Sequence, residues 1–160
     1  VVFAEILYNT DDALLVPLPF FLNVNLQWLI DESLTLPMTK TNHKAGETKG
    51  NFILNIEKAW TKMRCGMKEV DMTYGQWHEA ADNCFHFNVG CDKVGEEGPY
   101  AKWWEYHFGF FDSQNDKIEK FPTWHPLEEK LCKAYCSQPM TFSRDYYANK
   151  YRMAQLEHRM

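Results

Sequence analysis

Helix signals through the middle of the chain constrain its fold more than any other feature. The segment 51–70 carries apolar side chains three and four residues apart, which is the period of an amphipathic helix. Thr73 and Gln76 then form the capping-box pattern Thr-x-x-Gln, which predicts a second helix running to about Phe87. We expect the two helices to form a hairpin over about 51–87.

Three further helix starts follow. Pro99 comes directly after a glycine, and proline suits the first turn of a helix because its missing N–H is not needed there. Pro126 predicts a fourth helix, with Glu128 and Glu129 in the first turn, where negative charge suits the helix dipole. A last, tyrosine-rich helix is predicted from about Ser143. The sequence therefore predicts a mostly α, irregular helical fold.

The length of 160 residues is that of one ordinary domain with a real hydrophobic core. We expect residues 1–50 to form an extended N-terminal segment associated with a membrane or a partner, 51–140 a helical core, and 141–160 a terminal docking helix. The aromatic share of 16% is high, and aromatic side chains are favoured both in cores and at protein interfaces.

Residues 13–30 form a stretch without a charged side chain, which is marginally long enough to span a membrane. Pro17 and Pro19 stand two residues apart within it, and asparagine and glutamine alternate after them. Lipid cannot satisfy such polar groups. We therefore expect an extended segment, buried or lying on a membrane surface, and not a spanning helix.

Charge is spread along the chain. Residues 40–70 carry seven bases against three acids, whereas residues 92–129 carry four bases against nine acids. A nucleic-acid-binding protein needs a concentrated basic face, so we expect no nucleic acid partner.

No known catalytic or metal-binding motif stands out. His78, Asp82 and His86 lie four residues apart on one helix face, but eight residues of helix span about 12 Å, so one ion cannot bind both histidines. The chain has no HExxH, CxxC, GxGxxG or nucleophile-elbow pattern. We expect no catalytic residues, no metal and no cofactor.

The five cysteines predict a disulfide staple. Cys132 and Cys136 are four residues apart on one helix and face the same way, and Cys84 and Cys91 offer a matching pair. We expect the first pair to bond to the Cys84/Cys91 segment, in a connectivity that spacing does not fix, which leaves Cys65 reduced. Five reduced cysteines in a cytosolic helical protein are the alternative.

These cysteine spacings, together with the basic, tyrosine-rich end SRDYYANKYRMAQLEHRM, resemble the PDSW-type accessory subunit of mitochondrial complex I. That family carries Cys-x6-Cys and a later cysteine pair, but the later pair here is Cys-x3-Cys, a shorter spacing. The resemblance implies a disulfide-bonded helical subunit in the intermembrane space or on the inner-membrane surface. Insect odorant-binding proteins also use Cys-x3-Cys on a helical fold, although a sixth cysteine is missing here.

We therefore expect a non-catalytic accessory subunit of a respiratory-chain assembly, whose partners are other protein subunits and a membrane surface. A secreted helical protein that binds small ligands is the alternative. If Trp103, Trp104 and Phe108 line a closed cavity of several hundred cubic ångströms within one chain, the ligand-binding class is favoured. If they lie against another chain or lipid, the accessory-subunit class is favoured. The residues expected to dock on a partner are Trp103, Trp104, Phe108, Tyr146, Tyr147, Tyr151 and Arg152.

The terminal segment 141–160 shows no clean apolar face. A short helix without such a face is marginal in water by itself. We expect this segment to dock on a partner, so that its deletion leaves the stability of the isolated chain nearly unchanged.

Overall fold

The computed structural model describes residues 16–40, 52–91 and 98–159. They form a mostly α fold, as the sequence predicts, with one short antiparallel pair of strands. In chain order the elements are η1 (Leu18–Phe21, a 3-10 turn), α2 (Asn23–Asp31), β1 (Met38–Lys40), β2 (Phe52–Leu54), α3 (Ile56–Lys62), η2 (Glu69–Asp71, a 3-10 turn), α4 (Tyr74–Cys91), α5 (Pro99–Asp112), α6 (Phe121–Ser137) and α7 (Arg144–Arg159).

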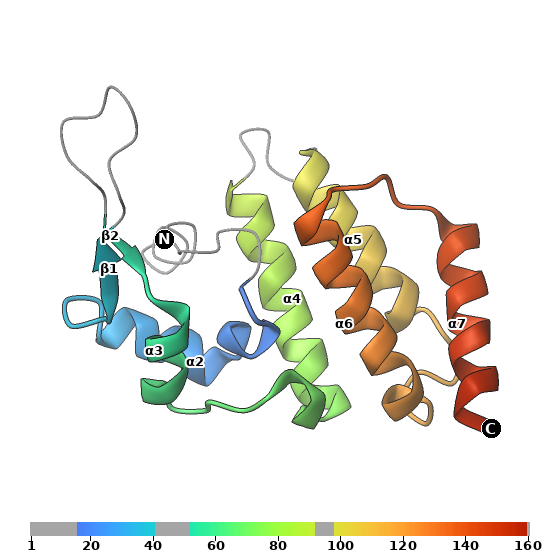
Figure 1. The fold of residues 1–160 in the computed structure, drawn as a ribbon, viewed down its shortest axis with the longest axis horizontal. Helices are drawn as coiled ribbons and strands as arrows, with labels where there is room; N and C mark the ends of the chain where they lie inside the picture. Colours follow the sequence, from blue (N-terminus) through green and yellow to red (C-terminus); the bar gives the residue numbers. More distant parts are fainter. Residues whose placement is uncertain (1–15, 41–51, 92–97, 160) are drawn as a thin grey trace.

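Helix α4 stands at the centre of this arrangement. Figure 1 shows the β1–β2 pair, α2 and α3 on one side of it, and α5, α6 and α7 on the other. Helix α4 packs mainly on η1 and α5, and α6 packs on α7. The expected hairpin of the first two core helices is therefore wrong, because the neighbours of α4 are η1 and α5 instead of α3.

The first core helix is much shorter than predicted. Residues 52–54 pair with β1, with Met38 opposite Leu54, so the helix begins only after Asn55. The Asn55 side chain caps it by accepting a hydrogen bond of 3.0 Å from the Lys58 backbone N–H. Shortly after its end the chain passes close over the helix: a Cβ at Gly66 would lie 2.5 Å from the Trp60 carbonyl oxygen. Only glycine fits this close approach.

The capping box at the start of α4 is confirmed. The Gln76 N–H donates to Thr73 Oγ1 at 3.2 Å, and the Thr73 N–H donates to Gln76 Oε1 at 2.9 Å. The helix continues to Cys91, beyond the predicted end at Phe87.

The start of α5 at Pro99 is confirmed, but α6 begins five residues before the predicted Pro126, at Phe121. Phe121 and Trp124 are buried, and the Trp124 indole N–H donates to the Lys117 carbonyl at 2.8 Å. Aromatic packing thus holds the extra turn, although Pro126 lacks the N–H that would continue the helical hydrogen bonds.

The described part of the uncharged stretch, residues 16–30, is mainly helical and not extended. In α2 the Asn25 side chain is fully buried. Its Nδ2 donates to the Pro19 carbonyl at 2.8 Å and to the Cys65 carbonyl at 2.9 Å, and its Oδ1 accepts from the Cys65 N–H at 2.9 Å. A polar residue of the uncharged stretch therefore joins two parts of the fold. No helix in the described part of the chain has both the length and the apolar character needed to span a bilayer.

Much of the aromatic surplus lies in the core. Trp77 on α4 meets Trp124 on α6 edge to face, with ring centroids 4.9 Å apart. The largest fully buried side chains include Trp77, Trp124, Tyr147, Phe20, Phe21 and Phe111.

Helix α7 belongs to this core, which the sequence did not predict. Tyr147 and Tyr151, one turn apart, are buried against α5. The Tyr151 hydroxyl donates to Asp116 Oδ1 at 2.9 Å. The expectation that this segment has no face to bury on its own core is therefore wrong.

Candidate functional site

A partly open cavity of about 720 Å³ lies between α3, α4, α5, α6 and the two 3-10 turns. Its volume falls within the range of small-molecule sites in proteins. Aromatic side chains make up much of the wall: Phe21, Trp60, Phe87, Trp104 and Tyr135. We call this space the cavity.

The carboxyl groups of Glu69 and Glu129 both lie at the wall of the cavity. Burial and the nearby negative charges of Glu128 and Glu129 raise the pKa of Glu69 to about 8, and a hydrogen bond with Glu129 contributes to the rise. Lys133 Nζ, which also lines the cavity, lies 2.8 Å from Glu129 Oε1. At neutral pH the Glu69 carboxyl is therefore largely protonated and can donate a hydrogen bond.

Three thiols line the cavity, and they overturn the predicted staple. Cys84, Cys132 and Cys136 are all reduced, as is Cys65, so none of the four cysteines whose side chains the structure describes forms a disulfide. The side chain of Cys91 lies outside the described part. Burial raises the pKa of the Cys84 and Cys132 thiols well above the ordinary range, which keeps both thiols neutral.

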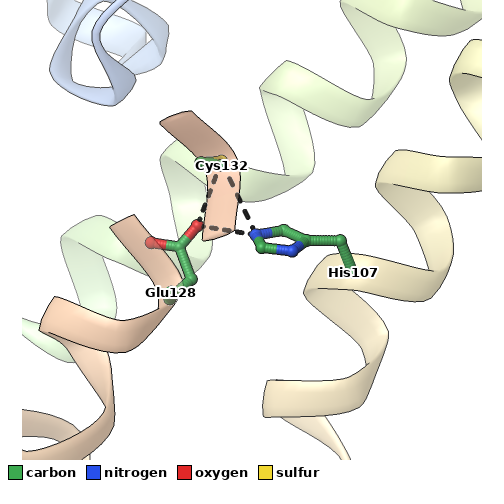
Figure 2. A group of neighbouring side chains, drawn as sticks. All are labelled: His107, Glu128 and Cys132. Atoms are coloured by element: carbon green, nitrogen blue, oxygen red, sulfur yellow. Dashed lines mark hydrogen bonds and ion pairs between the residues drawn. The ribbon is translucent and has the colours of Figure 1, made fainter. Parts of the chain in front are cut away.

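Cys132 also belongs to a second feature, a cluster with His107 and Glu128 (Figure 2). His107 extends from α5 toward two residues of α6 that are four positions apart. His107 Nε2 lies 3.0 Å from Glu128 Oε1 and 3.6 Å from Cys132 Sγ, and the sulfur lies 3.5 Å from Glu128 Oε1. We call these three residues the HEC cluster.

The surroundings of His107 fix its ring. The indole of Trp103 stacks on the imidazole with centroids 4.7 Å apart. The Tyr147 hydroxyl lies 2.7 Å from His107 Nδ1, at hydrogen-bonding distance. Burial, with the nearby Cys132 and Glu128, raises the pKa of Tyr147, so its hydroxyl stays protonated. Both ring nitrogens of the buried imidazole therefore have partners, and Nε2 faces Glu128 and Cys132.

The HEC cluster does not have the geometry of a nucleophilic triad. In a triad the nucleophile and the orienting acid bind opposite nitrogens of the imidazole. Here Cys132 and Glu128 lie at the same nitrogen, Nε2. The three ligand atoms nevertheless lie within 4.8 Å of one another, which would let them hold one metal ion.

One atom of the HEC cluster lacks a partner. Glu128 is fully buried, and its Oε2 accepts no hydrogen bond from the described residues. A buried carboxylate oxygen without a partner is costly, so this atom needs an explanation.

The residues expected to dock on a partner lie mostly inside the protein. Trp103, Trp104 and Phe108 are buried, and Trp104 lines the cavity, whereas Trp103 packs between Tyr135 and His107. Trp104 and Phe108 also line a smaller pocket of about 150 Å³. Of the four candidates on the terminal helix, Tyr147 and Tyr151 are buried, while Tyr146 and Arg152 are exposed.

The helical stripe of His78, Asp82 and His86 does not gather into a site. All three side chains are exposed; His86 Nδ1 lies 2.8 Å from the Asp82 carbonyl oxygen, and His78 lies near Asp112 instead.

The sequence did not identify His107 as a site residue, and it indicated Glu128 only as part of a helix start. The spacing of Glu128 and Cys132 on one helix was a signal, but nothing local pointed to His107.

Comparison of the chain with models of protein families, with curated proteins and with solved structures finds no match. The resemblance to PDSW-type accessory subunits therefore stays a prediction.

Proposed function

We propose that this protein binds a small, mainly apolar molecule in the cavity and catalyses no reaction. The observation that carries the proposal is the volume of about 720 Å³ in a partly open cavity, whose lining is mainly apolar, includes five aromatic side chains, and holds charged side chains among them. Natural ligand sites have this combination, because apolar contact supplies most of the affinity and a few polar groups fix the orientation.

The polar groups indicate what kind of ligand fits. The pKa of Glu69, raised to about 8 by burial and neighbouring carboxylates, leaves a protonated carboxyl at neutral pH. Two lysines, Lys68 and Lys133, and two further acids, Glu57 and Glu129, line the same space, and Lys133 is paired with Glu129 at 2.8 Å. We infer a ligand with an apolar or aromatic body and one neutral hydrogen-bonding group, such as a carbonyl or a hydroxyl.

Titration of the full chain with the neutral dye N-phenylnaphthylamine tests this function. We expect one dye molecule per chain, with enhanced dye fluorescence and energy transfer from the two tryptophans at the cavity wall, Trp60 and Trp104. The variant Cys136→Phe places a ring in the cavity and should weaken binding at least about tenfold, because it removes the apolar volume that the dye would fill.

The matched control is Ala134→Phe, which adds the same ring on the exposed side of α6. Equal dye binding by wild type and Ala134→Phe, with loss only in Cys136→Phe, supports the proposal. If both variants bind the dye as tightly as the wild type does, the dye lies outside the cavity, which would overturn the proposal.

A second proposed function, an accessory subunit of a respiratory-chain assembly, draws support from the outer side of α7. Tyr146, Met153 and Leu156 are large apolar residues that the fold leaves exposed there. Such residues are candidates for contact with another subunit.

Native gels of mitochondrial membranes test this second function. The tagged chain should migrate with a large complex. Met153→Asp should abolish this migration, whereas Ala148→Asp, at another exposed position of α7, should not. Migration of the wild type as a monomer would contradict this function.

A further inference from the structure

We propose that His107, Glu128 and Cys132 form a binding site for one divalent metal ion of the zinc type, with its remaining coordination position toward the cavity. This site is separate from the ligand binding proposed above, and it can exist whether or not the cavity takes a small molecule.

The first argument is the size of the HEC cluster. Zinc binds nitrogen and oxygen at about 2.0–2.2 Å and thiolate sulfur at about 2.3 Å, so the edges of a tetrahedral site measure roughly 3.3–3.6 Å. The nitrogen–sulfur and sulfur–oxygen distances in the cluster are 3.6 Å and 3.5 Å. The nitrogen–oxygen distance of 3.0 Å is a hydrogen bond, which the ion would replace and lengthen by about 0.3 Å.

The second argument is charge. A thiolate from Cys132 and the carboxylate of Glu128 together carry two negative charges, which neutralise a divalent ion, while His107 coordinates as a neutral imidazole. A buried site tolerates little net charge, so this ligand set suits an ion with two positive charges. The proton that Cys132 loses passes to solvent.

The third argument is the partnerless oxygen of Glu128. Oε2 is buried and accepts no hydrogen bond from the described residues, although a carboxylate in such a place needs compensation. A divalent ion bound at Oε1 supplies that compensation, because it withdraws charge from the whole carboxylate. A hydrogen-bonded cluster alone leaves this oxygen without it.

The identity of the ligands limits which metal can bind. A thiolate with an imidazole and a single carboxylate favours zinc or cobalt, whereas calcium and magnesium prefer sites made only of oxygen atoms. The Tyr147 hydroxyl at Nδ1 is the outer partner that a metal-bound imidazole needs, since it can accept the N–H while Nε2 binds the ion. Cys132 alone of the three also lines the cavity, so the ion would enter from that side.

Cobalt titration of the metal-free full chain tests the site without any variant. We expect one Co²⁺ per chain, with the intense visible bands of tetrahedral cobalt and a thiolate-to-cobalt charge-transfer band in the near ultraviolet. Zn²⁺ added in equal amount should remove both signals by displacement, and mass spectrometry for metals should then count one zinc per chain. Absence of bound metal, or a spectrum without the thiolate band, would overturn the proposal.

Two cysteine variants locate the ion. Cys132→Ser should lower zinc affinity at least about 100-fold, beyond the usual loss for an outer-shell partner. Cys136→Ser is the matched control, because Cys136 lies one turn along α6 and lines the same cavity but is outside the HEC cluster. Equal affinity in wild type and Cys132→Ser, or equal loss in both variants, would overturn the assignment.

Tyr147→Phe tests the hydroxyl at His107 Nδ1. Loss of this outer partner should lower the zinc affinity about tenfold or more without removing the cobalt bands. Circular dichroism and thermal melts with chelator establish that each variant folds. In folded wild type, zinc should also raise the melting temperature, and this increase should vanish in Cys132→Ser. An equal increase in both would place the metal elsewhere.

Discussion

His107 Nε2 and Glu128 Oε1 lie 3.0 Å apart, and both side chains are completely buried. Removing one member of such a pair leaves the other without its partner in an apolar environment, which costs several kcal/mol. We expect Glu128→Ala to lower the free energy of unfolding by about 3 kcal/mol in chelator-treated protein. Urea denaturation followed by circular dichroism measures it.

The matched control for this prediction is Glu105→Ala, which removes an exposed carboxylate from α5. We expect a change of less than about 0.5 kcal/mol there, as for most surface substitutions. If the two variants lose equal stability, the buried pair contributes nothing beyond the loss of a surface charge.

Asn25 is expected to be as important to the fold as an apolar core residue. Its amide makes both hydrogen bonds to the backbone of Cys65, each at 2.9 Å, and a third to the Pro19 carbonyl. Asn25→Ala would leave these backbone groups without partners. We expect a loss of about 3 kcal/mol in the free energy of unfolding, measured by urea denaturation.

Gln27→Ala on the same helix serves as the comparison, because the exposed Gln27 bonds only to Asp31 four residues on, among the described residues. Its loss should stay below about 0.5 kcal/mol. Equal effects of the two substitutions would show that the Asn25 bonds do not hold η1 and α2 to the chain near Cys65.

Glu69 should make the protein less stable as the pH rises. Its pKa is about 8 in the folded chain, raised by burial and neighbouring carboxylates, against an ordinary value of 4.5. Between these values the folded chain holds a proton that the unfolded chain has lost, so the free energy of unfolding falls as pH increases. The slope from one proton is at most about 1.4 kcal/mol per pH unit.

Glu69→Gln should remove this part of the pH dependence, because glutamine stays neutral in both states. Urea denaturation at about pH 5 and about pH 8 compares the slopes. Asp71→Asn, an exposed acid in the same 3-10 turn, should leave the wild-type slope in place. A Glu69→Gln variant with the full wild-type slope would be inconsistent with a raised pKa at this carboxyl.

Helix α7 should contribute to the stability of the isolated chain. Tyr147 and Tyr151 are buried on α5, so deletion of residues 141–160 should destabilise the protein, contrary to what the sequence pattern predicts. The point variant Tyr151→Ala should cost about 3 kcal/mol, the lower end of the range for large aromatic truncations. The melting temperature should fall by about 10 °C.

Tyr146→Ala is the control within α7, because Tyr146 is 47% exposed. Its melting temperature should change by no more than about 2 °C. A wild-type melting temperature for Tyr151→Ala would instead agree with a helix that needs a partner to be held in place.

The start signals of α4 and α5 were predictable because they act over three or four residues. Thr73 and Gln76 satisfy each other's backbone groups whatever the rest of the chain does, and Pro99 fits the first turn of a helix by its own covalent structure. The start of α6 was not predictable in this way, because Phe121 and Trp124 extend it by packing on distant aromatic rings.

The sequence by itself determined the mostly helical class, the capping box and the cysteine pair that shares one face of α6. The tertiary structure alone decided that residues 52–54 pair with β1, that the described thiols stay apart, and that His107 meets Glu128 and Cys132 across two helices. The physical reason is range. Backbone hydrogen bonds in a helix depend on neighbours four residues apart, whereas His107 and Glu128 are 21 residues apart and meet only because α5 and α6 bury their aromatic faces together.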